Sequence, residues 1–315
     1  MTSYPPSDVR SRPFKQVDVF TAAPYLGNPL AVVLDGGGLD EQAMRRFAAW
    51  TNLSETTFLL PPTDPTADYR VRIFTPSEEL PFAGHPTLGS CHAWLQAGGK
   101  PRDPEFIVQE CTVGLVRIRR EELAGGRQRF AFAAPPLKRS APSPAYLSQV
   151  AAALGLKAVQ IRAAQVLDNG PVWFGLLLDK PETVLALTPD YQSLKRLNAM
   201  VGIAAFYDVE EAAPLIGRAN REAQAFAQST PDVTNFMPDA EVRAFAEPFE
   251  DPVTGSFNAA LAQWLMQDGM VPDSYRASQG VCMGRAGQVH ITRDPAGQVW
   301  VGGESVTCIS GEVTL

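Results

Sequence analysis

The sequence predicts a mixed α+β protein that is built from two related halves. The prediction rests on two turn-and-helix segments, residues 81–99 and 250–269, which lie about half a chain apart. Each segment follows a strand-like run, gathers Pro, Thr, Gly and Ser within a few residues, and continues as an apolar helix that contains a Trp. Each predicted helix ends at a glycine, as many helices do. A repeat of this kind indicates two similar α+β units.

The other elements follow from local sequence patterns. Alternation of apolar and polar residues predicts strands, whereas runs of helix formers predict helices. Strands are expected at 14–22, 28–35, 55–62, 69–76, 105–122, 127–135 and 158–179, in short segments up to 249, and through most of 282–315. Helices are expected at 39–53, 87–97, 143–155 and 191–201, and within 250–269.

Length and charge limit the possible functions. The chain has 315 residues, enough for one large domain or two ordinary ones. Its net charge of -7 argues against nucleic acid as the main partner, because nucleic-acid binders carry a basic surface. No apolar run approaches the roughly 20 residues of a membrane span, so no membrane partner is expected. Residues 1–13 are polar and proline-rich, and we expect them to form a disordered leader.

The cysteines and histidines give no support for a metal site. Four cysteines, Cys91, Cys111, Cys282 and Cys308, are widely separated, and no two form a CxxC pair. This spacing favours reduced, buried thiols in a cytoplasmic protein, with a reactive thiol as the alternative. A metal site needs three or four converging ligands, and the three histidines are scattered. We therefore expect no metal.

His85 is the first candidate for chemistry. It lies between Gly84 and Pro86, at the start of a predicted helix. A helix N-terminus lowers the pKa of a histidine, and a neutral imidazole can donate or accept a proton near pH 7. The alternative is a structural histidine whose hydrogen bonds are satisfied. His92 lies inside the same predicted helix and is expected to pack or to face solvent.

Two carboxylates are further candidates. Glu55 lies at a helix-to-strand junction, where it is either a surface residue or a general acid or base whose pKa burial would raise. Asp251 precedes Pro252 at the second turn, and an Asp-Pro pair often only initiates a turn. Above a helix N-terminus, however, the same carboxylate could hold an amino group or transfer a proton.

The two predicted helix N-termini suggest a site for a small anion. If they face one another across a central cleft, their unsatisfied N–H groups and positive dipole ends could bind a small carboxylate. The alternative is that Thr87, Thr254 and Ser256 are only caps and turn formers.

Five segments, taken in order, give the chain a family resemblance: residues 17–35, 52–60, 79–90, 250–265 and 279–291. Together they resemble the PhzF-like phenazine-biosynthesis isomerases, from about residue 14 to the C-terminus. The resemblance implies the diaminopimelate-epimerase-like fold, with two similar domains, each a mainly antiparallel sheet wrapped around a central helix, and an active site in the interdomain cleft. The implied domains are 14–134 with 296–315, and 135–295.

The same resemblance implies a reaction and a set of residues. The family reaction is isomerisation of trans-2,3-dihydro-3-hydroxyanthranilate without a cofactor or a metal. The implied substrate is small and carries a carboxylate and an amine or hydroxyl. The resemblance assigns proton transfer to Glu55, further catalytic roles to His85 and Asp251, and substrate binding to Asn28, Gly84, Gly255 and Ser256.

The cysteine positions separate this chain from related enzymes. Diaminopimelate epimerases and proline racemases use a pair of thiols, one in each turn-and-helix unit. Neither turn here contains a cysteine, and Cys91 lies four residues after Thr87, in the helix body. Proton transfer by carboxylate is therefore favoured over a two-thiol mechanism. Two alternatives remain: an epimerase or racemase that uses Glu55 and Asp251 on opposite faces, and a small-molecule-binding protein that does not catalyse a reaction.

The resemblance also bears on association and on one variable region. The family is usually found as homodimers, so we expect a homodimer. Residues 181–230 match the family least well. They belong to the second predicted domain and are candidates for shaping the substrate pocket.

Overall fold

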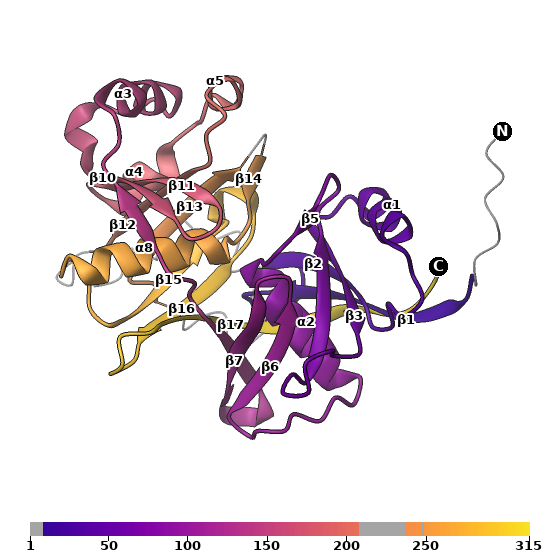
Figure 1. The fold of residues 1–315 in the computed structure, drawn as a ribbon. Coiled ribbons are helices and arrows are strands. Elements are labelled where there is room, and N and C mark those ends of the chain that lie inside the picture. Colours follow the sequence, from indigo (N-terminus) through magenta and orange to yellow (C-terminus); the bar gives the residue numbers. More distant parts are fainter. Residues whose placement is uncertain (1–8, 208–236, 247–248) are drawn as a thin grey trace, which may run out of the picture. The chain divides into compact units, whose positions relative to one another are not determined.

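The computed structural model describes residues 9–207, 237–246 and 249–315, and it has a mixed α+β fold (Figure 1). The chain divides into two compact units, residues 1–133 with 302–315, and residues 134–301. Of the leader expected at 1–13, residues 1–8 lie outside the described residues. Residues 11–13 are already part of the first strand, so the expected leader was too long.

The first unit is a ring of hydrogen-bonded strands. Ladders connect β17 to β1, β1 to β2 to β3 to β4, β4 to β6, β6 to β7 to β8, and β8 back to β17. The strands are β1 (Ser11–Val19), β2 (Asn28–Val33), β3 (Glu55–Leu60), β4 (Tyr69–Phe74), β5 (Glu79–Leu80), β6 (Phe106–Cys111), β7 (Gly114–Glu122), β8 (Gln128–Ala133) and β17 (Val299–Thr314). The β17 strand begins in the second unit and ends in the first.

Helix α2 (Gly84–Gln96) forms the centre of the first unit. It contacts β1, β2, β3, β6 and β8, and nine of its thirteen residues are buried. A Cβ at Gly89 would lie 2.6 Å from Leu30, so glycine is needed for this close approach. The helix begins three residues earlier than expected. Pro86 does not prevent this, because the third helical residue has no intrahelical N–H partner to lose.

Helix α1 (Glu41–Thr51) connects β2 to β3, which run parallel. Asp40 caps its N-terminus by accepting a hydrogen bond from the backbone N–H of Ala43. Asn52 ends it in the left-handed conformation, with φ of 54°. Its inner face packs on a cluster that includes Phe47 and Phe58.

The second unit repeats the order of elements seen in the first. In both units, a hairpin leads through a helical crossover to a parallel third strand, then to a fourth strand, a short fifth strand and a buried helix. Parallel strands require such crossovers, which explains the helices between the second and third strands of each unit. The elements are β9 (Lys138–Ser140), α3 (Pro144–Ala153), β10 (Ile161–Asp168), β11 (Val172–Leu178), α4 (Pro181–Ala186), α5 (Tyr191–Arg196), β12 (Val201–Phe206), β13 (Ala240–Ala246), β14 (Phe249–Asp251), α8 (Gly255–Gln267), β15 (Ser274–Gln279) and β16 (Gly287–Arg293).

Helix α8 is the counterpart of α2. It contacts β10, β11 and β16, and ten of its thirteen residues are buried. A Cβ at Gly202 would lie 2.1 Å from the ring of Phe257, so β12 can approach this helix only with glycine there. A second apolar cluster, centred on Leu176, Val201 and Ile203, packs beneath α3, α4 and α5.

Residues 181–230, which match the family least well, are only partly described by the structure. The helix expected at 191–201 ends at Arg196, because Asn198 has a positive φ of 48° and β12 begins at Val201. Helix α4 was not expected. The remainder of the 181–230 region, from residue 208, lies outside the described residues.

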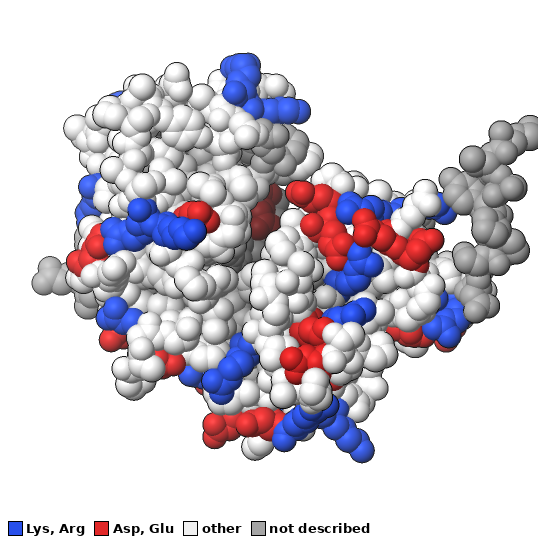
Figure 2. All heavy atoms as spheres, viewed as in Figure 1, with Lys and Arg blue, Asp and Glu red and all other residues white. Residues whose placement is uncertain are grey.

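The face shown in Figure 2 is mixed in charge. On the face shown in Figure 2, Lys and Arg side chains lie scattered among Asp and Glu side chains, without a continuous basic area. Every helix in the described part of the chain is too short or too polar to reach across a lipid bilayer.

Candidate active site

The first unit brings Glu55 and His85 together. Glu55 is the first residue of β3, and His85 is the second residue of α2. His85 Nε2 lies 3.3 Å from Glu55 Oε2, and the two side chains are 6% and 16% exposed. A histidine next to a shielded carboxyl group is an arrangement that can hold and move a proton.

His85 is neutral at physiological pH. Burial lowers the pKa of its imidazole to about 3, although a hydrogen bond with the Pro29 backbone opposes the shift. The sequence predicted a lowered pKa from the helix N-terminus, whereas the structure makes burial the main cause. A neutral imidazole can donate or accept a hydrogen bond at Nε2, depending on its tautomer.

Asn28 and Gly84 lie close to these residues in the fold. Asn28 is the first residue of β2, is fully buried, and directly precedes Pro29, which contacts His85. Gly84 is the first residue of α2. The N-cap residue, Ala83, has no side-chain hydrogen bond to the helix, so the first N–H groups are not capped by that side chain.

The second unit gathers the other predicted residues. Asp251 ends β14, Thr254 is the N-cap of α8, and Gly255 and Ser256 are its first two residues. Thr254 makes no side-chain cap bond to α8 and instead donates from Oγ1 to Asp251 Oδ2 over 2.6 Å. The Thr254 hydroxyl therefore orients the Asp251 carboxylate rather than the helix.

Ser256 is held by two residues that the sequence analysis missed. Trp173 Nε1 donates to Ser256 Oγ over 3.1 Å, and Asn169 Nδ2 donates to the Ser256 carbonyl over 2.9 Å. Asn169 lies in the β10–β11 turn, and Trp173, which is 1% exposed, is the second residue of β11. The internal repeat could have pointed to Trp173. It is the second residue of β11, and Pro29, the second residue of β2, contacts His85 in the first unit.

In the first unit, Thr87 has a structural role. Its Oγ1 donates to the Ala83 carbonyl over 2.9 Å and accepts from Gln109 Nε2 over 3.0 Å. The alternative interpretation, in which Thr87 stabilises the turn, fits these contacts. His92 likewise packs, with its ring against Phe130 and its Nε2 3.1 Å from Thr307 Oγ1.

The cysteines only partly match the expectation of buried thiols. All four are free, but only Cys91 and Cys111 are buried, whereas Cys308 is partly exposed and Cys282 is exposed. Burial raises the pKa of the Cys91 thiol, which makes it a poor nucleophile. Among the described residues, no group of three or more His, Cys, Asp or Glu side chains is placed to hold a metal ion.

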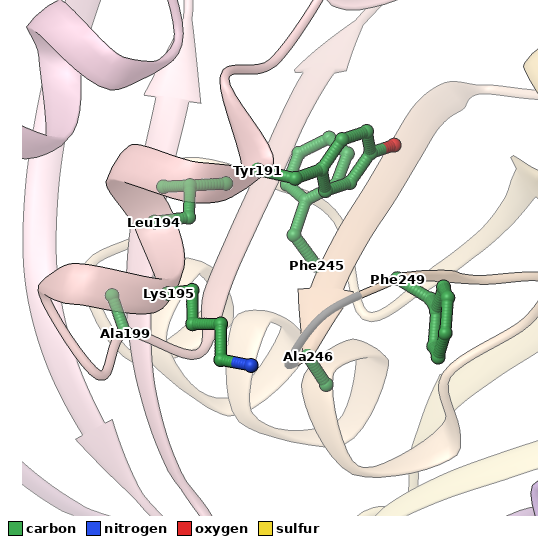
Figure 3. Close-up of a pocket in the computed structure, with 7 residues that line it drawn as sticks. All are labelled: Tyr191, Leu194, Lys195, Ala199, Phe245, Ala246 and Phe249. Atoms are coloured by element: carbon green, nitrogen blue, oxygen red, sulfur yellow. The ribbon is translucent and has the colours of Figure 1, made fainter.

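A small pocket in the second unit is separate from these residues (Figure 3). It is mostly apolar and aromatic, and none of the predicted site residues lines it. The lining residues are Tyr191, Leu194, Lys195, Ala199, Phe245, Ala246 and Phe249.

Comparison with known proteins establishes the family. The family model described as PhzC-PhzF, phenazine biosynthesis-like protein, matches residues 17–311. The chain therefore belongs to this family, in agreement with the resemblance found in the sequence.

Three relatives illustrate the range of the family. The chain is 35% identical to antisense-enhancing sequence 1 of Schizosaccharomyces pombe, over 95% of this chain and 97% of that protein. It is 30% identical to an uncharacterized isomerase of Mesorhizobium japonicum, over 98% and 100% of the two chains. It is 37% identical to trans-2,3-dihydro-3-hydroxyanthranilate isomerase of Pseudomonas aeruginosa, over 56% and 61%.

Solved structures show the same fold. A PhzF-family protein of Bacillus anthracis superimposes with a TM-score of 0.76 at 20% identity, over 97% of this chain and all of that one. A hydroxyproline epimerase of Agrobacterium vitis gives a TM-score of 0.59 at 15% identity, over 97% and 93%. At these identities the likeness concerns the fold alone.

Proposed function

We propose that this protein is a cofactor-independent isomerase that moves a proton within a small carboxylate-bearing substrate. The observation that carries the proposal is the contact between Glu55 and neutral, buried His85, made in a chain of the PhzF family. A named relative acts on trans-2,3-dihydro-3-hydroxyanthranilate, and we propose a substrate of similar chemistry.

Glu55 is the proposed general acid and base. It takes a proton from an activated carbon and returns it to another carbon of the conjugated system, so no oxidant or reductant is consumed. A carbon acid loses its proton slowly, so the base must be held close to it. Strand β3 fixes the backbone of Glu55, and the His85 ring lies against its carboxyl group.

The second turn supplies the other proposed roles. Asp251 orients or relays a proton to a polar substituent, while Ser256 and the amide groups at Gly84 and Gly255 bind the carboxylate. Uncapped amide groups at a helix N-terminus suit an anion. We further propose that both turns act on the same substrate molecule, in a cleft between two domains, and that Asn28 contributes to binding. Support for this part of the proposal comes from the chain's membership of the PhzF family, whose model matches residues in both turns.

An assay in deuterium oxide tests the function. The protein is incubated with trans-2,3-dihydro-3-hydroxyanthranilate, and the product is followed by absorbance and NMR. We expect isomerisation, with the migrating hydrogen placed on a new carbon. Deuterium at the original carbon with inverted configuration would instead indicate an epimerase. Binding without turnover or exchange would contradict the proposal and favour a non-catalytic binding protein.

We also propose a homodimer, as is usual in the family. Ile309 of β17 and Leu115 of β7 are about half exposed and are the kind of apolar strand residues that an interface would cover. Light scattering at micromolar concentration should give twice the 34.1 kDa mass of one chain. A monomer mass would contradict this.

A further inference from the structure

We infer that Gln279 is a positioning residue which, through Thr254, determines which oxygen of Asp251 can carry a proton. The inference rests on the proposed function, because it assumes that Asp251 exchanges protons with the substrate. Gln279 is the last residue of β15 and is fully buried. It lies beside the turn that joins β14 to α8, and its amide group forms hydrogen bonds both to that turn and to α8.

Gln279 makes four hydrogen bonds. Its Oε1 accepts from the Thr254 backbone N–H over 3.0 Å and from Asn258 Nδ2 over 2.9 Å. Its Nε2 donates to the Asp251 carbonyl over 3.1 Å and to Thr254 Oγ1 over 2.9 Å. One side chain therefore connects the carboxylate residue, the N-cap residue and the first turn of α8.

The backbone fixes the orientation of this amide. The Thr254 N–H can only donate, and the Asp251 carbonyl can only accept. A rotated Gln279 amide would place its NH₂ against an N–H and its oxygen against a carbonyl. The assignment of Oε1 and Nε2 therefore follows from chemistry.

The fixed amide in turn directs the Thr254 hydroxyl. Because Gln279 Nε2 donates to Thr254 Oγ1, the single hydroxyl hydrogen must point to another acceptor. The acceptor that it meets is Asp251 Oδ2, at 2.6 Å. Hydrogen bonds to a charged carboxylate are short and strong, and this distance fits one.

The consequence concerns the proton on Asp251. While Oδ2 accepts from Thr254, a proton on Oδ2 would weaken that hydrogen bond, because the O–H oxygen of a carboxylic acid is a poorer acceptor than a carboxylate or carbonyl oxygen. A proton carried by Asp251 therefore resides on Oδ1. The chain from Gln279 to Thr254 to Asp251 directs proton exchange to one oxygen and holds the other in place.

Asn258 completes the support from the helix. Its Nδ2 donates both to the Thr254 carbonyl, over 2.9 Å, and to Gln279 Oε1. Asn258 is fully buried, so the turn is anchored from the helix as well as from β15. The first unit has a related but simpler contact, from buried Gln109 to Thr87. No hydrogen bond described there continues from Thr87 to a carboxylate, which makes Gln109 a matched control.

Neutron diffraction from crystals exchanged into deuterium oxide tests the inference without a substrate. We expect a deuteron on Thr254 Oγ1 that points to Asp251 Oδ2, and two deuterons on Gln279 Nε2. A deuteron on Asp251 Oδ2, or a Thr254 hydroxyl that points elsewhere, would overturn the inference. This outcome is independent of whether the proposed reaction occurs.

Kinetics with trans-2,3-dihydro-3-hydroxyanthranilate provide the second test. Thr254→Val removes the donor and should lower kcat at least about tenfold, the scale of a lost hydrogen bond to a charged group, with little change in KM. Thr254→Ser should restore kcat to within about threefold of the wild type. Gln279→Glu offers an acceptor in place of the donor, so it should draw the hydroxyl away from Asp251 and lower kcat by a similar factor.

Combining the changes separates positioning from general stability. Thr254→Val with Gln279→Glu should be no slower than the worse single variant, because both break one chain of contacts. If Gln279→Glu does not fold, Gln279→Met takes its place.

The control variant, Gln109→Met, should leave kcat within about threefold of the wild type. The inference would be contradicted if the fold-decrease in kcat of the double variant equalled the product of the two single decreases. It would also be contradicted if Thr254→Ser lowered kcat as much as Thr254→Val. If the wild-type protein showed no turnover, the proposed function would be refuted. The neutron experiment would still test the hydrogen-bond chain from Gln279 to Asp251.

Discussion

The indole nitrogen of Trp173 donates a hydrogen bond to the hydroxyl of Ser256 over 3.1 Å. Trp173 is the second residue of β11, and Ser256 is the second residue of α8. In the first unit, the second residue of β2, Pro29, contacts the second residue of α2, His85. The repeat therefore places a polar side chain at the same helical position in each unit and holds it from the equivalent strand.

Trp173→Phe tests the binding role of Ser256. The change removes the N–H that fixes the hydroxyl, and a hydrogen bond of this kind contributes about 0.5–1.5 kcal/mol. We therefore expect KM for a carboxylate substrate to rise about 2–10-fold, with a smaller change in kcat. Steady-state kinetics measure both.

Trp264→Phe is the matched control for that variant. Trp264 lies near the other end of α8, is equally buried, and donates to Asp268 Oδ2 over 2.9 Å. It should lower stability without raising KM. Equal increases in KM for both variants would show that Trp173 acts only through packing.

The histidines predict how stability depends on pH. Burial lowers the pKa of His85 to about 3 and that of His92 to about 4, whereas an unfolded histidine titrates near 6.5. As the pH falls below about 6.5, the unfolded chain binds protons that the folded protein excludes, so stability decreases down to about pH 3. The urea midpoint should fall over this range, and NMR should show both rings neutral at pH 5.

His92→Gln checks the assignment of this effect. It removes one of the two buried imidazoles and leaves the contact between Glu55 and His85 in place. The loss of stability between pH 6.5 and 4 should become shallower. A His85 ring that titrates near pH 6.5 in the folded protein would contradict the prediction.

Glu241 should produce the opposite dependence on pH. Burial raises the pKa of this carboxyl group to about 8, although Ser278 and Arg243 oppose the shift. The folded state therefore holds a proton that the unfolded state releases near pH 4.5, and stability decreases as the pH rises from about 4.5 to 8. Glu241→Gln should raise the urea midpoint at pH 8.5 relative to the wild type.

The comparison at low pH controls for packing. At pH 4 the wild-type carboxyl is protonated in the folded state and mostly protonated in the unfolded state, so the amide should give little advantage there. Exposed Glu182→Gln should have little effect at either pH. A gain from Glu241→Gln that is the same at both pH values would rule out a titrating Glu241.

Local signals made much of the fold predictable. The glycines, prolines and threonines around His85 and Ser256 mark two helix starts, and the structure has buried helices at both. Glu55 was expected at a strand start and is the first residue of β3. Helix α2 begins at Gly84 rather than at the expected Thr87, because a proline such as Pro86 is tolerated within the first helical turn.

Long-range contacts made the rest unpredictable. Trp173 and Gln279 reach the second turn from β11 and β15, at sequence separations of 83 and 25 residues from Ser256 and Thr254. Periodicity indicates which residues form a strand but does not say which strands pair. The parallel pairing of β13 with β15, which places Gln279 beside α8, is a tertiary property of the chain.

Glu55→Gln is the central test of the catalytic proposal. The amide keeps the size of the side chain and much of its hydrogen bonding, but it cannot accept a proton. We expect turnover to fall at least ~100-fold, the usual scale for removing a general base, while substrate binding is retained. Calorimetry measures the binding, and solvent-deuterium incorporation measures the proton transfer. Glu78→Gln, an exposed glutamate in the same unit, should leave both unchanged. Near-normal deuterium incorporation by Glu55→Gln would assign the proton transfer to another group. Asp251 would then be the first residue to substitute in the search for that group.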